Sequence, residues 1–182
     1  QVPHSTALHA LLQGKPYLVG PLARINLNID HLPADICDLL KAAGITFPSQ
    51  NMFHSIVARA VEIWIVIDEA LRLLQDYLKP AEAAVSWQPN AGSGTAATEA
   101  PRGLLWHQYQ LDDRGRIQTA RIIPPTSQNQ ARIEEDLRNS LQMFGLEQDD
   151  DALRLHGETV IRNYDPCISC ATHFLQLDIK RN

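Results

Sequence analysis

Two cysteines and one histidine recur at three-residue steps near the end of the chain, as Cys167, Cys170 and His173. Residues three positions apart lie on the same side of a helical turn, so both sulfurs can reach one ion, and thiolates are the ligands that soft metals prefer. His173 continues along the same side and could hold a second, harder ion. A Cys-x-x-Cys pair is shared by zinc sites and thiol–disulfide enzymes, so the pair alone leaves the chemistry open.

The overall composition is typical of a folded protein with one hydrophobic core. Of the 182 residues, 45% are hydrophobic and 20% are charged, and the formal net charge is −5. The net charge is acidic and the sequence has no local cluster of Lys and Arg, so neither indicates nucleic-acid binding. Three cysteines are too few for a disulfide framework, and we expect Cys37 to be a buried small hydrophobic residue.

The sequence gives no sign of export or membrane insertion. Its first residues, Gln-Val-Pro-His, lack the basic and apolar regions of a signal peptide. The longest apolar stretch, residues 61–74, is interrupted by Glu62, Asp68, Glu69 and Arg72, which argues against a membrane span. We therefore expect a cytoplasmic protein without membrane insertion.

Most of the elements expected to position the cysteines are helices. Ser5 is expected to cap a short helix that ends before Gly14, and residues 15–24 are expected to form a connection rich in Gly and Pro. A second helix is expected from Pro33 to Gly44. Apolar residues then recur at steps of three and four from about residue 50 to residue 79, which predicts a long central helix.

The hydrophobic period changes in the second half of the chain. Residues 91–95 have the composition of a flexible loop. Residues 104–111 and 116–123 flank the turn Asp-Asp-Arg-Gly, which predicts a β-hairpin with Gly115 at a positive φ. Two further helices are expected, over residues 127–144 and 150–164. The predicted fold is mainly α with a small β-hairpin, a helical bundle around the long central helix at about 50–79.

Longer sequence motifs give the cysteines a context. The terminal string Asp-Pro-Cys-Ile-Ser-Cys-Ala-Thr-His, residues 165–173, resembles the nickel-binding signature of [NiFe]-hydrogenase large subunits at every defined position. Four earlier segments resemble the same family in order along the chain. They are Tyr-Leu-Val-Gly-Pro-Leu-Ala-Arg at 17–24, Phe-His-Ser-Ile-Val-Ala-Arg-Ala-Val-Glu at 53–62, Glu-Ala-Pro-Arg-Gly at 99–103 and Pro-Thr-Ser-Gln-Asn at 125–129.

The resemblance implies a fold and a subgroup. Residues 1–182 would be the carboxy-terminal portion of a hydrogenase large subunit, with its helical-bundle fold. Exported enzymes of the family usually carry Trp where Gln128 stands. Gln128, Ser169 and Thr172 are more similar to the cytoplasmic, multimeric enzymes that use NAD(P), F420 or related carriers.

The resemblance also assigns roles around the metals. Cys167 would be a terminal nickel ligand and a candidate base for the proton released when H2 is split, and Cys170 would bridge nickel to an iron that carries cyanide and carbon monoxide. Arg102 would place a permanent charge over the open metal position, and Asp165 would pair with or orient that arginine. These assignments make Arg102, Asp165 and Cys167 the candidate catalytic residues.

Further residues of the same motifs would complete the pocket. Pro101 and Pro125 would shape it, and the Thr126 hydroxyl would donate to a cyanide nitrogen. The same hydroxyl is also a candidate N-cap of the helix over residues 127–144. His173 and the backbone carbonyl of Ile122 resemble ligands of the buried magnesium or iron ion of the family.

One departure from the family pattern limits what the chain is expected to do alone. Family members bind nickel through four cysteines, and the first pair comes from an Arg-x-Cys-Gly-x-Cys motif that this sequence does not contain. We therefore expect the isolated chain to be inactive and compatible with a metal-free state. The resemblance implies an iron–sulfur small subunit, nickel-insertion and endopeptidase maturation proteins and H2 as partners, with residues 174–182 as a cleavable tail.

Two classes of function remain open at this point. One is an oxidoreductase portion, the nickel-cysteine part of a hydrogenase large subunit. The other is a non-catalytic interaction module or zinc-binding module derived from the same fold. The related quinone-module subunit of respiratory complex I shares the fold but lacks the nickel cysteines, so Cys167 and Cys170 argue against it.

Overall fold

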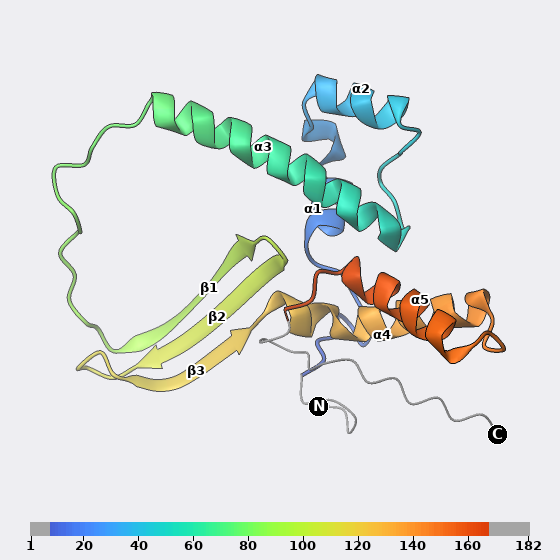
Figure 1. The fold of residues 1–182 in the computed structure, drawn as a ribbon. Coiled ribbons are helices and arrows are strands. Elements are labelled where there is room, and N and C mark those ends of the chain that lie inside the picture. The colour runs from blue at the N-terminus through green and yellow to red at the C-terminus, as the bar shows by residue number, and fades with distance from the viewer. Residues whose placement is uncertain (1–7, 168–182) are drawn as a thin grey trace.

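The computed structural model describes residues 8–167, in which helices predominate over one small sheet (Figure 1). The α-helices are α1 (Pro21–Asn28), α2 (Ala34–Ala42), α3 (Ser55–Gln75), α4 (Pro125–Phe144) and α5 (Asp150–Arg162). Short 3-10 turns at Ile29–His31 and Met52–His54 follow α1 and precede α3. The strands are β1 (Gly92–Ala100), β2 (Gly103–Leu111) and β3 (Ile117–Ile123). The expected fold class, mainly α with a small β element, is confirmed.

The long central helix exists, but it is shorter than expected at both ends. Before it, the side chain of Asn51 accepts a hydrogen bond from the Phe53 backbone N–H at 3.0 Å and starts a 3-10 turn. The α-helix proper spans 21 residues from Ser55 to Gln75, a length of about 30 Å. It ends at Gln75, five residues before Pro80, and a proline would in any case disfavour helical geometry at residue 79.

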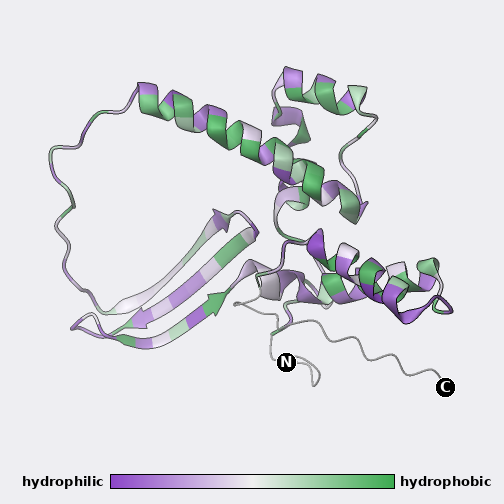
Figure 2. Cartoon of the chain, in the orientation of Figure 1, coloured by the Kyte–Doolittle hydropathy of each residue, from purple (hydrophilic) through white to green (hydrophobic). Residues whose placement is uncertain are grey.

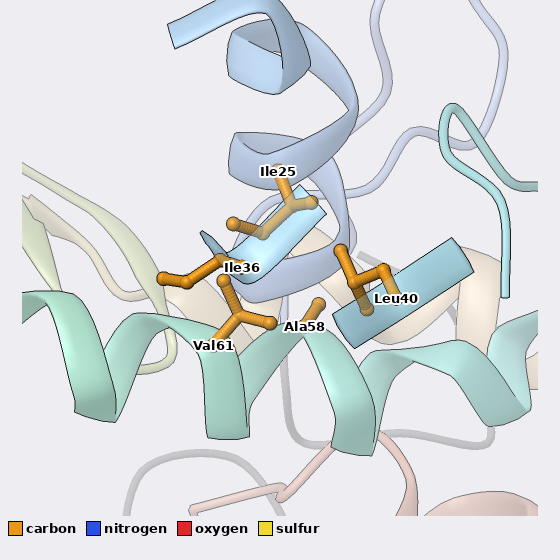
Figure 3. Packing of buried hydrophobic residues seen from close by; sticks show 5 residues of the cluster. All are labelled: Ile25, Ile36, Leu40, Ala58 and Val61. Atoms are coloured by element: carbon orange, nitrogen blue, oxygen red, sulfur yellow. The ribbon is translucent and has the colours of Figure 1, made fainter. Parts of the chain in front are cut away.

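The main apolar cluster lies where three helices meet (Figure 3). Ile25 of α1, Ile36 and Leu40 of α2, and Ala58 and Val61 of α3 are all less than 9% exposed. The connection expected over residues 15–24 is therefore only partly correct, because α1 begins at Pro21. Proline at the first helical position costs no hydrogen bond, and Leu22 and Ile25 gain burial.

The distal part of α3 leaves its apolar side chains uncovered by the described residues. Trp64, Ile67, Leu71 and Leu74 are each more than half exposed. Figure 2 shows hydrophobic residues recurring along the helix, well past the cluster that contacts α1 and α2. No helix in the described part of the chain is both long enough and apolar enough to cross a membrane.

The expected hairpin is present and carries an additional strand. β2 pairs antiparallel with β3 around Gly115, whose φ of 74° confirms the expected positive value. The Asp112 carboxylate closes the turn by accepting the backbone N–H groups of Arg114 and Arg116 at 2.9 and 2.8 Å. The loop expected over residues 91–95 is wrong from residue 92 onward, because residues 92–95 belong to β1, which pairs with β2 from Gly92 to Ala100.

Helices α4 and α5 pack against each other and confirm the two helices expected there. Ile133, Leu153 and Val160 are buried, and the Asp149 side chain caps α5 by accepting the Ala152 N–H at 3.0 Å. Ser140 Oγ lies 2.8 Å from His156 Nε2 across the two helices. The helix expected up to Gly14 is absent over its described residues.

A tight turn stands at the end of that expected helix. Leu12 and Lys15 exchange two backbone hydrogen bonds of 2.9 and 3.0 Å. Gln13 and Gly14 between them have φ of 51° and 77°. Two successive positive φ values match a two-residue hairpin turn and are incompatible with a helix.

Candidate functional site

Three segments that are far apart in the sequence meet at the candidate site. They are the turn between β1 and β2, the beginning of α4, and the residues that follow α5. After α5 the chain turns back toward the beginning of α4 (Figure 1). Contacts between Arg102 and Asp165 and between Thr126 and Cys167 join the three segments.

Arg102 and Asp165 contact each other through both backbone and side chain. Arg102 Nε donates to the Asp165 carbonyl oxygen at 2.7 Å and lies 3.1 Å from Asp165 Oδ2, and Nη2 donates to Oδ1 at 3.3 Å. Arg59 Nη2 approaches the same carboxylate at 3.9 Å. The two expected partners are thus brought together, and Arg59 of α3 is an additional positive charge that the sequence did not reveal.

Asp165 adopts an uncommon backbone conformation, with a φ of 48°. A residue with a side chain pays about 1–2 kcal/mol in this left-handed region. The turn is closed by hydrogen bonds from the Tyr164 and Asp165 N–H groups to the carbonyls of Ile161 and Arg162, both at 3.0 Å. Asp165 therefore marks the point where the chain leaves α5 and is redirected toward Arg102.

Thr126 contacts Cys167, the first cysteine of the terminal motif. Its Oγ1 accepts a hydrogen bond from the Cys167 backbone N–H at 3.2 Å, and Thr126 is 4% exposed. The interpretation of Thr126 as an N-cap is wrong, because α4 already begins at Pro125 and is preceded by Pro124 at the capping position. The Thr126 hydroxyl proton stays available to a further acceptor, because a hydroxyl accepts and donates at once. The Cys167 residue is half-buried.

The β1–β2 turn is anchored to the helices by Arg24. Arg24 Nε and Nη2 donate to the two carboxylate oxygens of Glu62 at 2.6 and 2.7 Å, and Nη1 donates to Glu99 Oε2 at 2.7 Å. The carbonyls of Ala100 and Pro101 accept the remaining two N–H groups at 3.0 Å. All five guanidinium donors therefore have acceptors. The hydrogen bonds to Glu62 raise the pKa of Arg24.

Two glycines allow the chain before α1 to pass directly beside Arg102. Gly20 and Gly103 have φ of 110° and 135°. A Cβ on Gly20 would lie 2.7 Å from the Arg102 carbonyl oxygen, and a Cβ on Gly103 would lie 2.6 Å from Val19 Cγ2. Both distances are far below van der Waals contact, so a side chain at Gly20 would push against the Arg102 backbone and one at Gly103 would push against Val19.

Buried amides at the start of α4 fix the same segment from the other side. The Asn129 side chain accepts the Val19 N–H at 2.8 Å and donates to the Val19 carbonyl at 3.0 Å. Gln128 accepts from the Tyr17 hydroxyl at 3.0 Å and donates to the carbonyls of Leu104 and Ile123. Both amide residues are 4% exposed. Their anchoring role was not evident from the sequence, where Gln128 served only to suggest a subgroup.

The other expected site residues are dispersed or lie outside the described residues. Pro101 and Arg59 border a cavity of about 620 Å³ between α1, α3 and the β1–β2 turn. Pro125 immediately precedes Thr126, whereas Ile122 lies in β3, opposite His107 of β2. Cys170 and His173 are not among the described residues. Within residues 8–167, no group of three or more His, Cys, Asp or Glu side chains is placed to hold a metal ion.

Comparison with known proteins connects this geometry to one family. The family model for "Nickel-dependent hydrogenase" matches residues 10–173. The chain is 35% identical to the alpha chain of sulfhydrogenase 1 of Pyrococcus furiosus over 178 residues, which cover 97% of this chain and 41% of that one. It is 34% identical to the beta chain of an NAD-reducing hydrogenase of Cupriavidus necator over 174 residues, which cover 86% and 34% of the two chains.

A solved structure is similar to this chain in fold as well as in sequence. The crystal structure of an NAD+-reducing [NiFe]-hydrogenase in its H2-reduced state matches with a TM-score of 0.72 and 30% sequence identity. The match covers 88% of this chain and 36% of the other. The chain therefore spans well under half the length of the relatives that it matches.

Proposed function

Because the chain belongs to the nickel-dependent hydrogenase family, we propose that it works as the carboxy-terminal part of the catalytic large subunit of a [NiFe]-hydrogenase. The reaction would be the heterolytic oxidation of H2 and, in reverse, the reduction of protons. One observation carries this proposal. Asp165 and Cys167 of the terminal motif contact Arg102 and Thr126, the residues that the family motifs assign to the same pocket.

The chemistry of the donor set fits a soft metal centre. Cys167 and Cys170 would hold nickel, and Cys170 would also hold the iron with its cyanide and carbon monoxide ligands, because thiolates favour such metals over harder ions. When bound, this centre would supply the redox metal at which H2 is cleaved. Two contacts support a shared pocket: the half-buried Cys167 donates its backbone N–H to the buried Thr126, and Asp165, two residues before Cys167, accepts from Arg102.

Residues of the chain would supply a fixed charge, a proton acceptor and a hydrogen-bond donor to this centre. Arg102 brings a fixed positive charge, and its hydrogen bonds to the Asp165 carbonyl and carboxylate limit the directions in which the guanidinium can point. The Cys167 thiolate would accept the proton released in H2 cleavage. The Thr126 oxygen accepts from the Cys167 N–H, which leaves its own proton to donate to a cyanide nitrogen.

Pro101 and Pro125 would complete the walls of the pocket, since each stands next to one of these polar residues in the sequence. His173 and the carbonyl of Ile122 would bind a separate magnesium or iron ion. The proposed partners are an iron–sulfur small subunit, nickel-insertion proteins and an endopeptidase that acts on residues 174–182. The proposed location is the cytoplasm, where the electrons would pass to a soluble carrier.

The proposal is tested by supplying the missing nickel cysteines. The 182-residue chain would be produced with a maturation system, alone and together with the amino-terminal part of the P. furiosus alpha chain. Alone, we expect no H2-dependent dye reduction, because the chain holds two of the four cysteines of the family pattern. Together, we expect the purified complex to contain nickel and to reduce the dye.

Cysteine variants make this test specific. Cys167→Ser should abolish nickel retention, whereas Cys37→Ser, a change in α2, should leave nickel content unaltered. Dye reduction by the chain alone would refute the expectation of an incomplete site. A complex that retains zinc instead of nickel would favour the zinc-binding alternative.

A further inference from the structure

A second polar cluster lies next to the candidate site and takes no part in the chemistry proposed for it. Tyr164, the residue before Asp165, is 9% exposed, and its hydroxyl donates to the carboxylate of Asp136 on α4. Arg132, one turn earlier on α4, holds the same carboxylate through Nη2 at 2.6 Å and Nε at 3.1 Å. Glu135 accepts from Arg132 Nη1 at 3.0 Å.

The cluster lies at the edge of a cavity with both polar and apolar lining residues. Arg132, Asp136 and Tyr164 border a cavity of about 290 Å³ that is also lined by Tyr17, Asn26 and Ser55. Burial raises the pKa of Tyr164, so the phenol stays protonated and remains a donor at neutral pH. The Asp136 side chain is 13% exposed, and at such burial a hydrogen bond to an ionised acceptor is strong.

The same segment therefore touches α4 at two points. Asp136 holds the Tyr164 side chain, and Thr126 holds the Cys167 backbone. The two α4 residues are about 15 Å apart along the helix axis. Three residues of chain reach at most about 11 Å, so the side chains that form the contact, those of Tyr164 and Asp136, make up the remaining span. Between the two points lies Asp165, whose positive φ persists only when its surroundings restrain it.

We propose that Tyr164, held by Asp136 and Arg132, is a positioning residue that fixes the path of residues 164–167, so that Asp165 meets Arg102 and Cys167 meets Thr126. Its importance for the enzyme rests on the function proposed above. The positioning itself is a property of the chain and can be measured without nickel or H2.

The test follows the reactivity of the Cys167 thiol in the full chain. After reduction, a Cys170→Ser chain would be labelled with iodoacetamide, and mass spectrometry would follow Cys167 and Cys37 separately. Tyr164→Phe removes only the hydroxyl. Loss of a hydrogen bond to a charged acceptor should make opening of the turn, and hence Cys167 labelling, about 10- to 100-fold more frequent. Cys37 in α2, which is half-buried rather than buried as expected, should keep its rate.

A matched control is offered by Tyr109, whose hydroxyl also has one side-chain partner, His107 Nδ1 at 3.1 Å. Tyr109→Phe should change neither labelling rate. Asp136→Asn also weakens the contacts of Arg132 and should raise the Cys167 rate. Combining it with Tyr164→Phe should raise the rate by less than the product of the two separate effects, because both changes act on the hydrogen bond between Tyr164 and Asp136. The Asp136 variant also serves if Tyr164→Phe proves poorly folded by circular dichroism.

Several results would overturn the proposal. A Cys167 rate within about 2-fold of the parent in Tyr164→Phe would mean that the hydroxyl does not hold the turn. A parallel rise at Cys37 would mean a general loosening of the fold. Fully additive effects of the two substitutions would mean that Tyr164 and Asp136 act separately. None of these outcomes depends on whether the chain binds nickel, so failure here is distinguishable from failure of the proposed function.

Discussion

Replacing Gly20 by alanine tests whether the chain before α1 really passes against the backbone of Arg102. Gly20 has φ 110° and ψ −162°, a region that is essentially restricted to glycine and costs other residues about 1–3 kcal/mol. The new Cβ would also lie 2.7 Å from the Arg102 carbonyl oxygen. The Cβ and the carbonyl oxygen are both bonded directly to the backbone, so neither can rotate away from the other. Overpacking of this kind costs about 1–3 kcal/mol more. The expected loss of unfolding free energy is about 2–6 kcal/mol.

Gly44→Ala is the matched control, because Gly44 also has a positive φ, 70°, but a Cβ there would meet nothing within 4 Å. Its expected cost is about 1–2 kcal/mol, from the left-handed conformation alone. Urea unfolding followed by tryptophan fluorescence and by circular dichroism would give both values, provided that the two probes coincide. At an m value of about 2 kcal/mol/M, Gly20→Ala should lower the midpoint by about 1–3 M.

The difference between the two variants is the informative quantity. Gly103→Ala should resemble Gly20→Ala, because its Cβ would meet Val19 at 2.6 Å from the opposite side of the same contact. Equal midpoints for Gly20→Ala and Gly44→Ala would refute the close approach. The contact between the chain at Gly20 and the Arg102 backbone would then no longer support the position of Arg102.

Two further predictions concern pH and the end of the chain. Burial and the hydrogen bond to Asp136 raise the pKa of Tyr164. The unfolded chain therefore releases the phenol proton first, and the free energy of unfolding should fall as pH rises above about 10. Tyr164→Phe should make the urea midpoint less sensitive to pH in that range, and an unchanged dependence of the midpoint on pH would contradict the raised pKa of Tyr164. The isolated chain should keep residues 174–182 beside a functioning maturation system if nickel insertion is the signal for cutting, and an intact mass that ends at His173 would show that the chain is recognised as mature.

Elements with a clear hydrophobic period were predictable from the sequence, and elements that depend on partners were not. The period of three and four residues predicted α3, helices were also expected where α4 and α5 lie, and the change of period around the turn that ends at Gly115 predicted β2 and β3. β1 escaped because Gly, Ser, Thr and Ala resemble a loop, and its strand geometry comes from the ladder with β2. α1 escaped because Gly20 and Pro21 look like a break, although proline suits the first turn of a helix.

The same division applies to the site. The motif residues Arg102, Thr126, Asp165 and Cys167 were recognisable because their types and order match a family pattern. Arg24, Gly20 and Asn129 were not assigned a role, since their partners lie in other elements and only the fold brings them together. Arg24 is the last residue of one segment that resembles the family, and Glu62 is the last residue of another. Their place in these segments was the signal in the sequence that could have pointed to their pairing.

The contacts also explain why positioning and charge are supplied by different residues. The Arg102 and Asp165 side chains are 44% and 40% exposed, and an ion pair in such surroundings contributes about 0–1 kcal/mol, too little to hold a turn that contains a positive φ. The Asn129 amide, 4% exposed, makes two hydrogen bonds to Val19, and Arg24 satisfies all five of its donors around the β1–β2 turn. A buried polar group that loses its partner costs about 1–3 kcal/mol, so these contacts are hard to break. Arg102 can therefore stay solvent-accessible and charged, because the backbone on either side of it is fixed by residues that have no chemistry to perform.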